Sequence, residues 1–255
     1  MGGFSSALPQ LACVALTGRT VERVLARGKH LVMVFDGDLV LRTHMRMSGS
    51  WHLYRHGERW NRPASAARIL LSTAGFEAVA FGVHEAEFLR SAQLDRLLEA
   101  RLGPDALADV FDEAEALRRL RADGRRTIAD ALLDQRTLAG VGNVYKSEVL
   151  FLAGLHPALR VGDIPEAVLA SLPGLARKTL LANVRRGAGA PVGPERRTTG
   201  RLAPSEDLWV YGRGGLPCRR CGTPIAWRRH GADARSTYWC PRCQPVTAPG
   251  GTTSL

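Results

Sequence analysis

Residues 127–157 read TIADALLDQRTLAGVGNVYKSEVLFLAGLHP, and this stretch indicates two helices joined by a loop that contains glycine. Apolar residues recur at helical spacing up to about Asp134 and again from Val144. Between them, Gly140 and Gly142 allow the backbone to approach a ligand closely, and Asn143 lies where the second helix begins. The stretch therefore predicts a helix–loop–helix element with a polar N-terminus on its second helix.

Asn143 admits two interpretations from the residues alone. Asparagine is a preferred helix N-cap, because its side-chain oxygen accepts a hydrogen bond from an amide of the first turn. A helix N-terminus is also a ready anion site, since its free amides and the helix dipole both favour negative charge. A cap and a phosphate ligand are both open at Asn143, and physics alone favours the cap.

Four of the five cysteines form two CxxC pairs, Cys218 with Cys221 and Cys240 with Cys243, separated by eighteen residues. This spacing is typical of a structural zinc site, in which each pair places two thiolates on one side of the ion. Because all four ligands are thiolates, no position is left for water, and the zinc is expected to stabilise the fold without chemistry. Two disulfides are the alternative, and they require an oxidising compartment that nothing in the sequence suggests.

Arginines crowd the arm between the cysteine pairs and the loop before it. From Arg185 to Cys243 there are twelve arginines against four acidic residues, with Trp227, Tyr238 and Trp239 among them. Guanidinium groups bind phosphate oxygens in a two-pronged way, so a zinc-stapled hairpin that presents arginine fits contacts to the DNA backbone. A solvated face on a small module is the alternative, and we expect DNA.

The charge of the whole chain is compatible with a nucleic-acid partner but does not establish one. Thirty-five basic and 24 acidic residues give a formal charge of +11 over 255 residues, and only three of the basic residues are lysines. An arginine-rich genome would produce the same bias. No apolar run is long enough to span a membrane, and the clustered cysteines fit a metal site in a reducing cytoplasm.

The first hundred residues favour strands, and the remainder favours helices. Short alternating or β-branched runs suggest a sandwich, and they lie at 20–24, 29–35, 39–44, 68–72 and 77–81. From about Phe111 the apolar period becomes helical, and helices are predicted at 113–121, 127–134, 144–153 and 165–184. The expected fold class is α+β, with an N-terminal β-sandwich, a helical domain and a zinc finger.

Five motifs follow one another along the chain: RGKHL at 27–31, HMRMSG at 44–49, LGPD at 102–105, LDQRTLAGVGNVY at 133–145 and LWVYGR at 208–213. In this order they resemble the formamidopyrimidine-DNA glycosylase/endonuclease VIII family. The second motif is similar to its wedge loop, the third to its interdomain marker and the fourth to its helix–two-turn–helix signature. The resemblance runs from about Leu16 to Gln244, and RTTG at 197–200 looks more like the endonuclease VIII branch than the purine-specific branch.

The resemblance implies a DNA glycosylase with abasic-site lyase activity in base-excision repair, acting on oxidised bases and favouring pyrimidines. In that family the damaged base is flipped out of the duplex into a pocket between the two domains. By position, Lys29, Asn143 and Arg235 would hold phosphates beside the lesion, and Met47 would be the wedge that fills the vacated space. A methionine packed under a turn is the alternative for Met47. The implied partner is damaged double-stranded DNA, bound by a monomer.

The family's chemistry uses an N-terminal proline, exposed by removal of the initiator methionine, followed by glutamate. An α-amino group is partly unprotonated near neutral pH, so it attacks the sugar C1′ and forms a Schiff base, while the carboxylate transfers protons. This chain begins Met1-Gly2-Gly3-Phe4, so no catalytic residue is identifiable in it. We expect a first helix, a first strand and the catalytic pair to be missing, most simply because the start is assigned too far downstream and the β-sandwich is therefore incomplete.

Three alternatives stand beside that expectation. The chain is a natural truncation that binds damaged or abasic DNA without cutting it, or it uses a replacement amine at Gly2 or Lys29. A zinc-ribbon protein of transcription or RNA is more distant, because it does not account for the wedge loop. The expected boundaries are a β-sandwich at 1–105, a helical domain at 106–204, a zinc finger at 205–244 and a disordered tail at 245–255.

Overall fold

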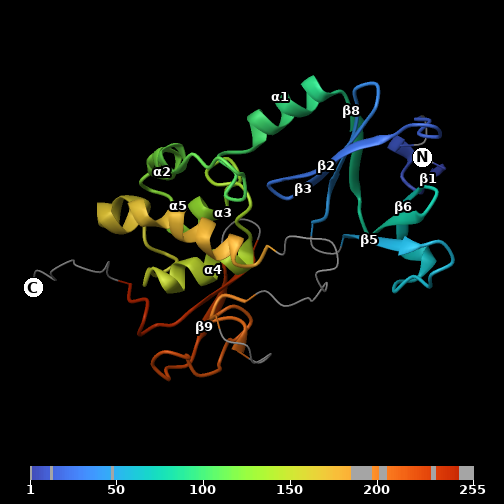
Figure 1. The fold of residues 1–255 in the computed structure, drawn as a ribbon. Coiled ribbons are helices and arrows are strands. Elements are labelled where there is room, and N and C mark those ends of the chain that lie inside the picture. The colour runs from blue at the N-terminus through green and yellow to red at the C-terminus, as the bar shows by residue number, and fades with distance from the viewer. Residues whose placement is uncertain are drawn as a thin grey trace, which may run out of the picture. The chain divides into compact units, whose positions relative to one another are not determined.

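The computed structural model describes residues 2–11, 14–46, 49–184, 197–200, 206–230 and 234–246. The chain forms two compact units, Met1–Ala100 and Arg101–Leu255. Two sheets make up the first unit, and most of the helices lie in the second (Figure 1). Of the tail expected at 245–255, residues 247–255 lie outside the described residues.

The first unit contains two antiparallel sheets of four strands, with the orders β1-β6-β7-β5 and β2-β3-β4-β8. The strands are β1 Gly3–Ser6, β2 Val21–Arg27, β3 His30–Phe35, β4 Leu39–His44, β5 Ser50–Arg55, β6 Ala67–Ser72, β7 Phe76–Phe81 and β8 Glu85–Leu89. Helix α1, Ser91–Arg101, follows β8, and short 3-10 turns lie at Pro9–Leu11 and Ala64–Ala66.

One apolar core joins the two sheets. Phe35 and Leu41 of β3 and β4 are completely buried, and they pack in one cluster with Ile69, Leu71 and Ala80 of β6 and β7. Burial of these side chains from water is the main favourable contribution to such packing. The predicted N-terminal β-sandwich is therefore confirmed.

The second unit has a helical part and a hairpin. The helices are α2 Glu113–Arg121, α3 Ile128–Leu133, α4 Asn143–Leu152 and α5 Glu166–Leu181, with a 3-10 turn at Val161–Asp163. The hairpin strands are β9 Ala226–His230 and β10 Arg235–Trp239. All four helices lie within a few residues of their predicted ranges, because the apolar period of each segment matches the face that it buries.

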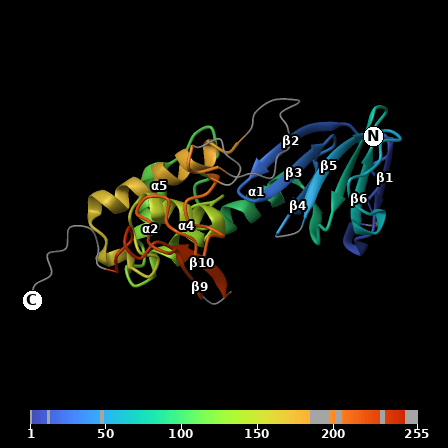
Figure 2. The ribbon, with the colours of Figure 1, turned by 90° about the horizontal axis from the view of Figure 1, so that it is seen from below.

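Helix α4 contributes to two cores at once. Val149 and Leu150 belong to the cluster that α2, α3 and α5 share, and both are completely buried. Phe151, the next residue, packs instead with Val210 and Ile225 of the cysteine-containing segment. Figure 2 shows α4 and β10 side by side. The helical part and the finger are thus joined through one helix.

Candidate nucleic-acid interface and metal centre

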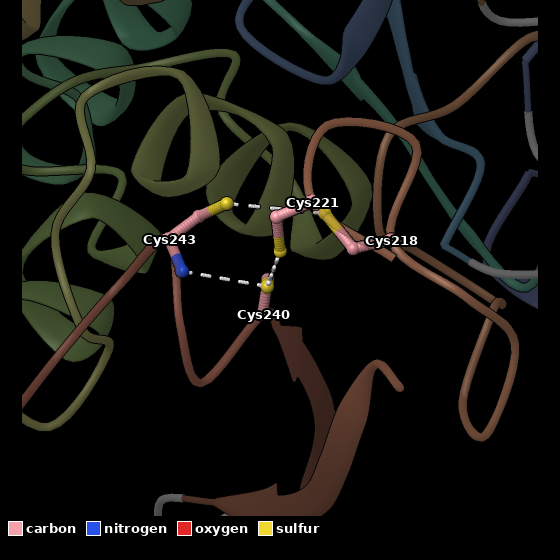
Figure 3. Close-up of side chains that lie close together, drawn as sticks. All are labelled: Cys218, Cys221, Cys240 and Cys243. Carbon is pink, nitrogen blue, oxygen red and sulfur yellow. Dashed lines mark hydrogen bonds between the residues drawn. The ribbon is translucent and has the colours of Figure 1, made fainter. Parts of the chain in front are cut away.

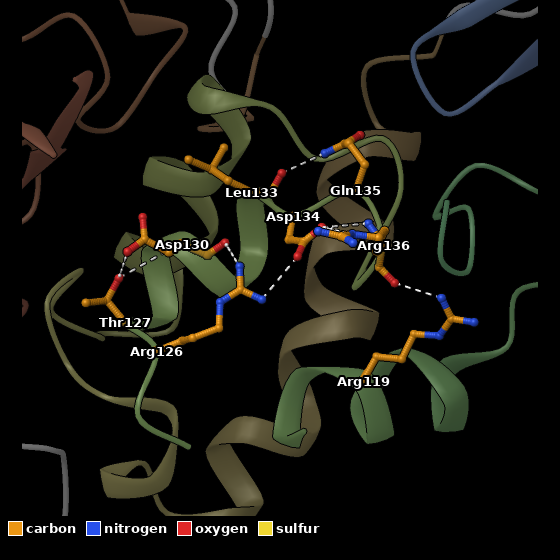
Figure 4. Close-up of polar contacts among 8 residues, drawn as sticks. All are labelled: Arg119, Arg126, Thr127, Asp130, Leu133, Asp134, Gln135 and Arg136. Atoms are coloured by element: carbon orange, nitrogen blue, oxygen red, sulfur yellow. Dashed lines mark hydrogen bonds and ion pairs between the residues drawn. The ribbon is translucent and has the colours of Figure 1, made fainter. Parts of the chain in front are cut away.

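The turn between α3 and α4 is held by the side chain of Gln135. Its Nε2 donates hydrogen bonds to the Leu133 carbonyl at 3.0 Å and the Val141 carbonyl at 2.9 Å. Its Oε1 accepts from the Gly140 amide at 3.1 Å, where a φ of 98° requires glycine. One amide side chain therefore pairs three backbone groups of the turn, and Figure 4 shows it reaching back toward Leu133.

Asp134, at the C-terminal end of α3, fixes the other side of this turn. Its carboxylate accepts hydrogen bonds from the Arg136 amide at 2.9 Å and from Arg126 Nη1 at 3.1 Å (Figure 4). Burial alone would raise the pKa of Asp134, but these two donors lower the pKa overall. At the start of α3, Thr127 caps the helix by accepting from the Asp130 amide. Both ends of α3 are therefore fixed before the chain reaches the turn.

Asn143 does not cap α4. Gly142 occupies the N-cap position with extended backbone, no side chain caps the helix, and Asn143 is the first helical residue. Its Nδ2 donates to the Ser236 carbonyl of β10 at 2.7 Å, and its Oδ1 accepts from Lys146 Nζ at 2.7 Å. The cap favoured from the sequence is wrong, because the side chain starts one residue too late and is drawn to the hairpin instead.

The four cysteine sulfurs converge. They lie within 4.8 Å of one another, with 3.5 Å between Cys221 and Cys240 and 3.9 Å between Cys218 and Cys243 (Figure 3). Four thiolates at about 2.3 Å from a central zinc ion would lie about 3.8 Å apart in a tetrahedron. Each of the four is a free cysteine, so no disulfide joins them. The donor set and its spacing fit a closed structural zinc site, as predicted.

The hairpin that the cysteines support presents arginine to solvent. Arg228 and Arg229 on β9 are exposed, and so is Arg235, the first residue of β10. Helix α4 has no acidic residue in its first turn. The N-terminus of α4 and the start of β10 therefore form a positively charged region that is suited to phosphate.

Two buried polar side chains attach the finger to the helical part. Gln244 donates to the Leu155 carbonyl at 2.7 Å and accepts from the Cys240 amide at 2.9 Å. Glu148 of α4 is completely buried and accepts from three consecutive backbone amides at 2.8–2.9 Å, those of Trp209, Val210 and Tyr211. It also accepts from the Thr198 hydroxyl. Sequence reasoning missed Glu148, although a carboxylate directly before the apolar run VLFL of a helix is a visible signal.

Lys29 lies in the first unit, at the tip of the β2–β3 hairpin. Arg27 and His30 form the last pair of that hairpin, and Gly28 has a φ of 56° in the turn between them. The rings of His30 and His44 lie 4.8 Å apart beside it. Burial lowers the pKa of His44, Glu85 opposes this shift, and Lys29 is among the cations that add to it. Lys29 therefore adds positive charge at the end of the β-sandwich strands.

Met47, the predicted wedge, lies outside the described residues. Its role stays a prediction. The cysteines, Asn143 and Arg235 are brought together in the second unit.

A glycine turn, a helix N-terminus and a zinc-supported arginine hairpin held in one unit define a DNA-binding zinc-finger protein with an N-terminal β-sandwich. The family models agree with each part. Residues 5–83 match the formamidopyrimidine-DNA glycosylase N-terminal domain, and residues 102–191 match the formamidopyrimidine-DNA glycosylase H2TH domain. Residues 215–246 match the zinc finger found in FPG and IleRS.

Relatives extend this agreement over nearly the whole chain. The chain is 47% identical to a probable endonuclease 8 2 of Streptomyces coelicolor, over 97% of this chain and 88% of the relative. It is 40% identical to the DNA-(apurinic or apyrimidinic site) lyase Nei2 of Mycolicibacterium smegmatis, over 94% and 88%. The Lactococcus lactis Fpg in complex with DNA containing an abasic site has a TM-score of 0.77 at 26% identity, over 95% of this chain and 91% of that one.

The chain belongs to the formamidopyrimidine-DNA glycosylase/endonuclease VIII family of DNA glycosylases and abasic-site lyases, which act in base-excision repair. The resemblance seen in its motifs is confirmed. In the part of the chain that the structure describes, no helix is long and apolar enough to cross a membrane.

Removal of zinc should abolish DNA binding while leaving the β-sandwich folded. Without the ion the finger loses the bonds that hold its buried cluster, and structural zinc sites of this type depend on the metal for folding. The measurement is affinity for an abasic-site duplex before and after chelation, with metal content determined in parallel. Restored affinity on adding zinc back is the control, and full affinity in metal-free protein would contradict the assignment.

Glu148→Gln should lower the free energy of unfolding by about 1–3 kcal/mol, because the NH2 group that replaces one carboxylate oxygen cannot accept, and at least one of the backbone amides that face this side chain is left as an unsatisfied buried donor. Urea denaturation measures the change. Glu113→Gln, at an exposed position at the start of α2, is the matched control and should have little effect. Equal stability of the two variants would show that the carboxylate does not join the finger to α4.

Proposed function

We propose that this protein excises oxidised bases from damaged duplex DNA, oxidised pyrimidines above all, and cleaves the strand at the resulting abasic site. Membership of the family supports the reaction class. The lesion class rests on the resemblance of residues 197–200 to the endonuclease VIII branch, and relatives from S. coelicolor and Mycobacterium bovis carry the names probable endonuclease 8 2 and endonuclease 8 2. The Lactococcus lactis Fpg has also been solved with DNA that contains an oxidised pyrimidine, at a TM-score of 0.78 and 26% identity.

The observation that carries the DNA-binding part is the hydrogen bond from Asn143 to the Ser236 carbonyl, at 2.7 Å. Ser236 directly follows Arg235, so the bond places the N-terminus of α4 beside the exposed guanidinium of the finger. Asn143 Nδ2 carries a second proton, and an arginine fork binds phosphate oxygens well. We assign both side chains to phosphates that flank the lesion.

Lys29 is assigned to a third phosphate, from the β-sandwich side. The tip of the β2–β3 hairpin carries its ammonium, which is close enough to His44 to help lower the pKa of that imidazole. Phosphate contacts position the duplex and carry no sequence information, so these groups orient the damaged strand but do not choose the lesion. Lesion choice instead depends on the cost of flipping a base, which is lowest for bases that already pair poorly.

Asn143→Ala and Arg235→Ala should each weaken binding to an abasic-site duplex by about ten-fold or more, because a hydrogen bond to a charged group contributes about 1.5–3 kcal/mol. Arg235→Ala should also reduce the slope of log affinity against log salt by about 1, since one phosphate fewer is neutralised. Arg118→Ala is the control, because this exposed arginine pairs with Glu115 within α2. Unchanged affinity in both Asn143→Ala and Arg235→Ala would contradict the assignment of these side chains to phosphates.

The purified protein should excise an oxidised pyrimidine faster than an oxidised purine and should be trapped on an abasic-site duplex by borohydride. Trapping reports the Schiff base that an amine of a lyase forms with the sugar C1′. Three duplexes that differ only in the lesion are compared, with undamaged duplex as the control. Faster removal of the purine would overturn the lesion class. Binding that keeps its salt dependence without any trapped band would indicate a binder of damaged DNA that lacks the lyase step.

A further inference from the structure

Lys146 is a completely buried lysine, one turn after Asn143 in α4. Its ammonium donates to Asn143 Oδ1 at 2.7 Å and to Thr237 Oγ1 on β10 at 2.7 Å. Both of these partners are neutral. Burying a charge is costly unless it is paired and hydrogen-bonded, so this lysine is held at a position where an apolar residue would be easier to accommodate.

The electrostatic surroundings of Lys146 agree with that cost. Burial lowers the pKa of Lys146, Asp130 on α3 opposes the shift and Arg235 on β10 adds to it, and together they bring the pKa to about 8. The folded protein therefore binds this proton less tightly than the unfolded chain. Below about pH 8 the buried charge opposes folding, and the penalty is relieved as pH rises above that value. Because the buried charge of Lys146 lowers the stability of the folded protein, its presence points to a role other than stability.

The geometry shows what the ammonium achieves. Because Lys146 faces Asn143 Oδ1, the amide of Asn143 cannot rotate by half a turn, and its Nδ2 must point to the hairpin. Because the same ammonium also holds Thr237, β10 is fixed at the residue two positions after Arg235. One buried charge thus sets the orientation of a side chain on α4 and the position of a strand of the finger.

We propose that Lys146 is a positioning residue for DNA binding: it fixes Asn143 and β10 relative to each other, so that Asn143 and Arg235 meet the DNA backbone as one preset pair. This inference rests on the phosphate contacts assigned above. Lys146 is not assigned a phosphate of its own, and it acts through Asn143 and β10. Preorganised groups bind more tightly because less ordering is required when the ligand arrives.

Lys146→Met should weaken affinity for an abasic-site duplex by about ten- to a hundred-fold, the range expected when one hydrogen bond to a charged group is lost. Lys178→Met is the matched control, because it removes the same charge from an exposed position on α5 and should leave affinity unchanged. Wild-type affinity in Lys146→Met would overturn the proposal. Zinc content and thermal unfolding of each variant establish that the finger is folded.

The pH profile separates positioning from a merely structural role. A bound phosphate favours the charged form of a nearby lysine, so wild-type binding should take up a proton and weaken as pH rises above about 8. Lys146→Met should be weak throughout and lose this dependence, while Lys178→Met keeps it. The same pH dependence in Lys146→Met as in the wild type would contradict the proposal.

A double-variant comparison tests whether Lys146 acts through Asn143. The double variant of Lys146→Met and Asn143→Ala should lose less affinity than the sum of the two single losses, whereas independent effects would add. Additive losses overturn the proposal. If Lys146→Met does not fold, Thr237→Val replaces it in all arms and should weaken binding in the same way. If Asn143→Ala loses affinity and Lys146→Met does not, the positioning role of Lys146 is rejected and the phosphate contacts stand. If neither Asn143→Ala nor Arg235→Ala loses affinity, the phosphate contacts themselves are rejected.

Discussion

The second unit depends on one constraint: helix α4 must satisfy two cores and two buried charges at the same time. Val149 and Leu150 are buried in the helical cluster, and Phe151 is buried in the finger cluster. Glu148 accepts from the amides of residues 209–211, and Lys146 holds β10. A buried charge is tolerated only in the geometry that pairs it, so these contacts define one position of the finger on the helix.

This constraint explains how distant segments form one DNA-binding surface. Asn143 and Ser236 are 93 residues apart in sequence and are joined by a hydrogen bond of 2.7 Å. The zinc site holds the hairpin in shape, Gln135 holds the turn before α4, and the buried charges join the two. Each device has a separate physical basis, namely metal coordination, backbone pairing and charge. The backbone that carries the exposed arginines then has little conformational freedom left to lose on binding.

The sequence predicts those helices and strands in which buried apolar residues recur with a regular helical or strand period. It misses the other elements for identifiable reasons. The helices at 113–121 and 144–153 were predicted because apolar residues recur on one face. Strand β8 was missed because Glu85 and Glu87 favour other structures, and they are accommodated by pairing across to His44 and Arg42 of β4. Helix α1 was missed because Leu94 alone among its residues is buried.

In the site too, residues marked by a local sequence pattern are predicted, and residues whose role depends on distant partners are missed. The cysteine spacing predicts the zinc ligands, and the motifs predict Asn143 and Arg235, because each of these signals is local. The roles of Lys146 and Glu148 depend on what lies opposite them in space, near residues 237 and 210, and no local pattern contains that information. The cap expected at Asn143 fails for the same reason, since the partner that competes with it is Ser236.

Because α4 packs in both the helical core and the finger core, the finger cannot be exchanged between proteins without this helix. A small zinc finger is often regarded as a transferable module. The two buried charged side chains that hold this finger, Glu148 and Lys146, belong instead to α4, and Glu148 lies 62 residues before its partner Val210. A chimera joined just before the finger would set a foreign loop against Glu148 and Lys146. The smallest unit that can be exchanged intact therefore begins at the turn before α4, and substitutions in that helix and in the finger are expected to change together in evolution.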